Sequence, residues 1–101
     1  MAEFKSQSIG IVLDERIAEG EYSNLVLIAH STSEFILDFA SLLPNMDKAR
    51  VKSRIILTPE HAKRLLYSLQ ENVKRYEDSF GKIPIVHPSA EEQFGQQIGE
   101  A

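Results

Sequence analysis

The fold is decided by residues 49–81, ARVKSRIILTPEHAKRLLYSLQENVKRYEDSFG, which predict a β-strand that turns directly into one long helix. Side chains alternate between the two faces of a strand. In the stretch 49–57 one set is mostly apolar, and its members are Val51, Ser53, Ile55 and Leu57. The other set is basic and consists of Arg50, Lys52 and Arg54. The pattern therefore predicts a strand with one apolar face and one basic face.

The helix expected at 59–80 has a start signal, an apolar stripe and a stop signal. Thr58 is a favoured N-cap, because its hydroxyl accepts a hydrogen bond from an unpaired backbone N–H, and Pro59 suits the first helical position. Gly81 suits the position just after the last turn. Apolar residues recur at steps of three and four, which is typical of an amphipathic helix. They are Ala62, Leu65, Leu66, Leu69, Val73, Tyr76 and Phe80.

Three further strands are predicted upstream of this unit, at 8–17, 22–30 and 34–40. With the strand at 49–57 they indicate a two-layer α+β domain, a four-stranded antiparallel meander followed by one long C-terminal helix. We expect the helix to lie across this sheet or across a partner subunit. The domain is expected at 8–82, after a flexible N-terminus at 1–7 and before an extended, flexible, acidic tail at 83–101.

The strands at 34–40 and 49–57 are expected to form an antiparallel hairpin. Its inner face would hold Phe35, Leu37 and Phe39 against Val51, Ile55 and Leu57. Its outer face would place Glu34 and Asp38 near Arg50, Lys52 and Arg54. These three basic residues are also a candidate anion-binding site for phosphate or nucleic acid. The net charge of −4 and the lack of interleaved aromatic side chains favour pairing with the carboxylates instead.

A second candidate surface comes from the strand at 22–30, which is apolar at both parities. Such a strand is usually covered on both faces. We expect Val26 and Ile28, with Ile36 beside them, on the face that the helix leaves uncovered. Because so small a domain has a marginal core, this candidate interaction surface predicts a homodimer or larger oligomer, with a further protein as an alternative partner.

The residues that carry chemistry are few and scattered. The absence of cysteine excludes disulfides and thiolate catalysis, and His30, His61 and His87 lack the spacing of metal ligands. His30 beside Ser31–Ser33 is more typical of a polar turn than of an activated hydroxyl. We therefore expect no enzyme, no metal and no cofactor. The N-terminus MAEFKSQS resembles no secretory signal, and no apolar run is long enough for a bilayer, which favours a cytoplasmic protein without membrane contact.

Several motifs together resemble a known family. The most specific is SRIILTPEHAKRLL at 53–66. The others are Tyr22-Ser23-Asn24, His30, Ser33-Glu34-Phe35, Leu37-Asp38-Phe39, Leu69, Asn72, Tyr76-Glu77 and Phe80-Gly81. They resemble a family of short bacterial and archaeal proteins defined only as a domain of unknown function. The resemblance covers residues 10–83. It implies a small soluble cytoplasmic domain and carries over no activity.

Three functions stay open at this stage. The first is a non-enzymatic, oligomeric protein-interaction module. The second is a holdase that binds unfolded chains on an apolar sheet face, because four strands followed by a long helix are loosely similar to the export chaperone SecB. That likeness concerns the order of elements only, and fold does not imply function. The third is a binder of nucleic acid or a small anion through Arg50, Lys52 and Arg54, for which nucleic acid is the less favoured partner.

Overall fold

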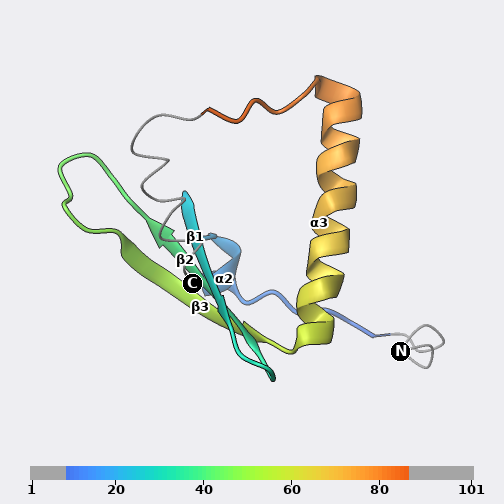
Figure 1. Cartoon of the computed structure of the whole chain (residues 1–101), viewed down its shortest axis with the longest axis horizontal. Coiled ribbons are helices and arrows are strands. Elements are labelled where there is room, and N and C mark those ends of the chain that lie inside the picture. The colour runs from blue at the N-terminus through green and yellow to red at the C-terminus, as the bar shows by residue number, and fades with distance from the viewer. Residues whose placement is uncertain (1–8, 87–101) are drawn as a thin grey trace.

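Three antiparallel strands and one long helix make up the computed structural model, which describes residues 9–86. The strands are β1 (Leu25–His30), β2 (Phe35–Ser41) and β3 (Arg50–Leu57), and they form a meander in the order β1-β2-β3. A four-residue helix, α2 (Glu15–Ala18), precedes the sheet, and α3 (Pro59–Phe80) follows it (Figure 1). The predicted α+β class, the antiparallel sheet and the long C-terminal helix are confirmed. The N-terminus at 1–7 and most of the tail at 83–101 lie outside the described residues.

The prediction of a fourth strand at 8–17 is wrong for the described residues. The chain at 9–14 is neither helix nor strand, and α2 begins at Glu15. Asp14 is the N-cap of α2, because its Oδ1 accepts a hydrogen bond of 2.9 Å from the backbone N–H of Arg16. This local bond competes with strand pairing and ends the extended segment before Glu15. The alternating apolar residues that suggested a strand are therefore exposed rather than paired.

The helix α3 forms for the reasons that the sequence indicates. The Thr58 hydroxyl accepts a 3.2 Å hydrogen bond from the backbone N–H of His61, and Pro59 occupies the first turn. Gly81 closes the helix at φ 100°, and its N–H donates to the carbonyl of Glu77. A positive φ is adopted by glycine without the steric cost that a Cβ imposes. The predicted bounds of 59–80 are confirmed.

The expected two-layer packing is not found within the described chain. Figure 1 shows α3 rising from the end of β3 and standing beside the sheet rather than across it. None of the residues Pro59–Phe80 is buried, and contacts between α3 and β3 are few. The buried apolar residues of the described chain are Leu37, 7% exposed, and Ala40, fully covered. The core is therefore confined to the central strand, and the helix contributes little to it.

Candidate functional site

The most conspicuous surface of α3 is a continuous apolar stripe, called here the α3 stripe. Its members are Ala62, Leu66, Leu69, Val73, Tyr76 and Phe80. Successive members alternate between steps of four and three residues, the repeat with which helices pack side by side. Leu69 is 57% exposed and Phe80 75% exposed, and the rings of Tyr76 and Phe80 lie 5.0 Å apart between centroids. The stripe is thus built for packing but has no packing partner within residues 9–86.

Charged side chains occupy the other side of α3 and pair along the helix. Arg64 bonds Glu60 at 2.8 Å, Arg75 bonds Glu71 at 2.8 Å and Lys74 bonds Asp78 at 3.0 Å. Each pair is four residues apart, which is the spacing at which helix side chains meet. The hydrogen bond from Arg64 also lowers the pKa of Glu60. The helix therefore has one solvated face and one apolar face.

The pairing register defines a second surface, called here the apolar sheet face. Val26 lies opposite Phe39 and Ile28 opposite Leu37, while Ile55 lies opposite Leu37 on the other side. Residues directly opposite each other on neighbouring strands share a face. The members of the apolar sheet face are Val26, Ile28, Phe35, Leu37, Phe39, Ile55 and Leu57. This register confirms the predicted packing of Phe35 and Leu37 against Leu57 and Ile55. The prediction is wrong for Val51, which lies opposite Ala40 on the reverse face because of a register shift.

One grouping in the predicted interaction surface is wrong. Ile36 pairs with Ala29 and with Ile56, so it lies on the reverse face, away from Val26 and Ile28. A strand shifted by one residue presents its side chains to the opposite face. Val26 and Ile28 instead join Leu37 on a single apolar surface, on which Ile28 is 42% exposed. Whether that surface binds a partner stays a prediction.

The reverse face has a charged pair at its centre. Arg54 lies opposite Asp38 and donates two hydrogen bonds to it, Nε to Oδ1 at 2.7 Å and Nη2 to Oδ2 at 2.8 Å. This two-point contact, aided by the positive charge of the guanidinium, lowers the pKa of Asp38. The predicted placement of Asp38 near Arg54 on the outer face of the hairpin is confirmed.

The three basic residues of β3 do not form one row. The register of β3 against β2 shifts by one residue at a bulge, since Phe39 lies opposite Ser53 but Ala40 lies opposite Val51. As a result, Arg50 lies opposite Ser41. Because Ser41 and Asp38 lie on different faces of β2, Arg50 and Arg54 are on different faces as well. Lys52 approaches Glu21, with 3.6 Å between Nζ and Oε2. The candidate anion-binding set is therefore divided, and two of its members already contact carboxylates.

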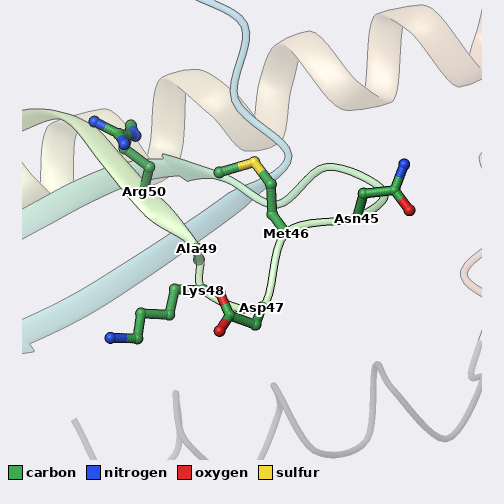
Figure 2. Close-up of a pocket in the computed structure, with 6 residues that line it drawn as sticks. All are labelled: Asn45, Met46, Asp47, Lys48, Ala49 and Arg50. Carbon is green, nitrogen blue, oxygen red and sulfur yellow. The ribbon is translucent and has the colours of Figure 1, made fainter.

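A shallow hollow lies in the loop between β2 and β3. It is lined by six consecutive residues, Asn45 to Arg50. Figure 2 shows the amide of Asn45, the ammonium of Lys48 and the guanidinium of Arg50 pointing away from one another. A ligand site normally brings polar groups together from several elements. This hollow offers no such convergence.

His30 and its neighbouring serines form a turn rather than a catalytic arrangement. The ring of His30 stacks on Phe35, with 5.3 Å between centroids. The N–H of Ser31 donates to the carbonyl of Glu34 at 2.9 Å, and the Ser31 hydroxyl accepts from the N–H of Ser33. Both interactions hold the polar turn that the sequence predicted. Among residues 9–86, no three carboxylate or histidine side chains gather as metal ligands would, and no helix is long and apolar enough to cross a membrane.

Ser23 and Asn24 have a structural role that the sequence did not reveal. The Asn24 amide donates to the carbonyl of Leu42 at 3.0 Å and accepts from the N–H of Leu42 at 2.9 Å. The Ser23 hydroxyl donates to the carbonyl of Ala40 at 2.8 Å. These bonds continue the pairing of β1 with β2 beyond Leu25 by means of side chains. Ser23 and Asn24 therefore help to hold the start of β1 against the end of β2 and the loop that follows it.

The sequence of the chain was compared with those of known protein families. The sequence pattern of the family described as "Protein of unknown function (DUF3467)" matches residues 1–85. The chain belongs to this family. The resemblance proposed from SRIILTPEHAKRLL and the associated motifs is thereby confirmed. No curated protein and no solved structure matches the chain, so the likeness to SecB has no support.

Proposed function

We propose that this member of the family is a non-enzymatic protein-interaction module that works as a homo-oligomer. The observation that carries the proposal is the helix α3, 22 residues long, none of them buried, with a regular apolar stripe along its length. Contiguous apolar patches that are exposed on a protein surface mark interaction surfaces. The apolar sheet face, on which Ile28 and Ile55 are exposed, supplies a second apolar surface in the same chain.

Energetics support the need for a partner. Burying one leucine contributes about 1.5–3 kcal/mol. Ordering the backbone of one residue costs about 1–2 kcal/mol. Leu37 and Ala40 are the buried apolar residues of the described chain, which is a small core for three strands and a 22-residue helix. The fold is therefore expected to gain its stability from burial between molecules.

A second copy of the chain fits these surfaces best. Each copy offers both an apolar helix stripe and an apolar sheet face, and within residues 9–86 the contacts between α3 and the sheet are few. A twofold arrangement brings the surfaces of one copy to those of the other reciprocally, and such symmetry is the commonest in oligomers. The ion pairs on the solvated side of α3 keep that side suited to water. The stripe, rather than the whole helix, is thus the expected interface.

Two matched substitutions test this proposal. Leu69 and Tyr67 are both 57% exposed, but only Leu69 belongs to the α3 stripe. Leu69→Asp is expected to dissociate the oligomer or unfold the chain, because it would bury an unpaired charge. Tyr67→Asp is expected to leave the mass in solution unchanged. Equal effects of the two substitutions on the mass measured by light scattering would contradict the proposal.

A binder of nucleic acid or a small anion has less support. Arg54 is engaged by Asp38 at two points, and Lys52 lies near Glu21. A holdase would use the same apolar surfaces as the oligomer does. A wild-type chain that is monomeric and suppresses the aggregation of an unrelated unfolded protein would favour the holdase over the module proposed here.

A further inference from the structure

The two outer strands of the sheet differ in how their free edges are protected. β3 carries Arg50, Lys52 and Arg54, and its pairing with β2 is broken by a bulge. Charged side chains and bulges are the usual means by which an edge strand is kept from pairing with another chain. β1, LVLIAH, has no lysine, arginine, carboxylate or proline, and its register with β2 is regular from Leu25 to His30. Among residues 9–86, β1 pairs with β2 alone, and its other edge is open to a further strand.

The same chain contains an apolar segment that no element covers. The residues Ile9–Leu13, sequence IGIVL, are described but belong to neither helix nor strand. Ile11 is 93% exposed and Val12 92% exposed. β-branched residues of this kind favour strands. In Figure 1 the segment leaves α2 and runs away from the sheet, past the base of α3. We call it the N-terminal arm.

We infer that the N-terminal arm of one copy adds as a strand to the free edge of β1 in a second copy. The inference rests on the proposed oligomer and names one of its contacts. Addition of an extended segment to an open sheet edge gains main-chain hydrogen bonds and is a common mode of recognition. The five arm residues span roughly 17 Å when extended, which fits within the six residues of β1. Two copies that exchange arms leave neither arm nor β1 edge unpaired.

The exchange also accounts for the strand-like sequence of residues 9–13, which do not form a strand within the described chain. Ile9, Ile11 and Leu13 alternate with Gly10 and Val12, as the residues of a paired strand do. The Asp14 cap starts α2 directly after the arm and keeps the arm separate from the following turn at Gly20. With the arm of a second copy, each sheet has four antiparallel or mixed strands. The fourth strand is thus expected between chains rather than within one.

Cysteine pairing tests the exchange, because the chain has no cysteine of its own. Chains carrying Ile11→Cys are refolded together with chains carrying Val26→Cys, Leu27→Cys or Ile28→Cys and are then oxidised. The expected result is a disulfide between different chains that is strong for at least one β1 position. Val86→Cys is the control, because Val86 also lies outside the helices and strands and is 67% exposed, but it is not part of the arm. It is expected to pair with none of the three.

Proline substitution gives a second, independent test of the arm exchange. Ile11→Pro removes a backbone donor from the arm, and proline is poorly tolerated within a paired strand. In hydrogen exchange, the β1 amides that do not bond to β2 are expected to lose protection in Ile11→Pro and to keep it in Val86→Pro. Unchanged protection in Ile11→Pro would overturn the inference.

These experiments distinguish failure of the arm exchange from failure of the proposed homo-oligomer. An oligomeric wild type that is dissociated by Leu69→Asp, but gives no cross-link to β1, overturns the arm exchange and retains the module. A disulfide that forms only when Ile11→Cys and a β1 cysteine are in the same chain shows that the arm folds onto its own sheet. That result also overturns the exchange. A monomeric wild type overturns both proposals.

Discussion

Asp38 on β2 and Arg54 on β3 lie directly opposite each other and are joined by two hydrogen bonds, of 2.7 Å and 2.8 Å. The Asp38 side chain is 13% exposed, whereas that of Arg54 is 61% exposed. The guanidinium therefore covers the carboxylate and continues toward solvent. This pair therefore engages one of the three basic residues of β3 with a carboxylate of the neighbouring strand.

The first prediction concerns the titration of Asp38. Its pKa is lowered chiefly by the hydrogen bonds from Arg54, so the carboxylate stabilises the folded state above its unfolded pKa, about 3.9. That stability is lost as the pH falls through the lower, folded pKa. An NMR titration of the Asp38 carboxyl carbon is expected to show a depressed pKa in the wild type. In Arg54→Gln it should rise toward the ordinary value, and an unchanged pKa would contradict the assignment.

The second prediction concerns the start of α3. Thr58→Ala removes the hydroxyl that accepts the N–H of His61, and the expected loss is about 1 kcal/mol in the free energy of unfolding. Thr58→Ser keeps the hydroxyl and is expected to lose far less. Chemical denaturation at one fixed protein concentration measures both, since oligomer stability depends on concentration. Equal losses in the two variants would show that the cap is not what stabilises this end.

The sequence predicts some parts of this structure better than others. The helix predicted at 59–80 is correct at both ends, because Thr58, Pro59 and Gly81 act through local backbone geometry. Local signals of this kind do not depend on the rest of the fold. The pairing of Phe35–Phe39 with Ser53–Leu57 was likewise predictable, since alternation and opposite charges agree there.

The errors arise where pairing depends on more distant parts of the molecule. The alternation at 9–13 predicts a strand, but this segment pairs with no strand within residues 9–86. The sequence placed Ile36 on the same face as Ile28, which is wrong. The correct face depends on the β1–β2 register, and because β1 is apolar on both faces, its sequence does not decide that register. The bulge that separates Arg50 from Arg54 has no clear signal in sequence either.

The third prediction concerns the tie between β1 and the loop after β2. Asn24→Ala removes both hydrogen bonds to Leu42, and each contributes about 0.5–1.5 kcal/mol. Asn24→Asp keeps the acceptor for the N–H of Leu42 but lacks the donor to its carbonyl. The expected order of unfolding free energy is wild type, then Asn24→Asp, then Asn24→Ala. Fast hydrogen exchange of the Leu42 amide in wild type would argue against this tie.

The fourth prediction concerns the small core. Leu37 is 7% exposed on the central strand, and Leu37→Ala is expected to cost about 2–5 kcal/mol in the free energy of unfolding. Ile56, on the reverse face, is 58% exposed, and Ile56→Ala is expected to cost clearly less. Thermal unfolding of the two variants at matched concentration compares them. A larger loss for Ile56→Ala would place the main buried interface on the reverse face instead.

The central claim is that the α3 stripe and the apolar sheet face are covered by a second copy of the chain. The most direct test is the molar mass of the wild-type protein in solution, measured by light scattering at micromolar concentration. The account predicts a mass of twice 11.4 kDa or a higher multiple. A single species of 11.4 kDa that is folded at that concentration would contradict it.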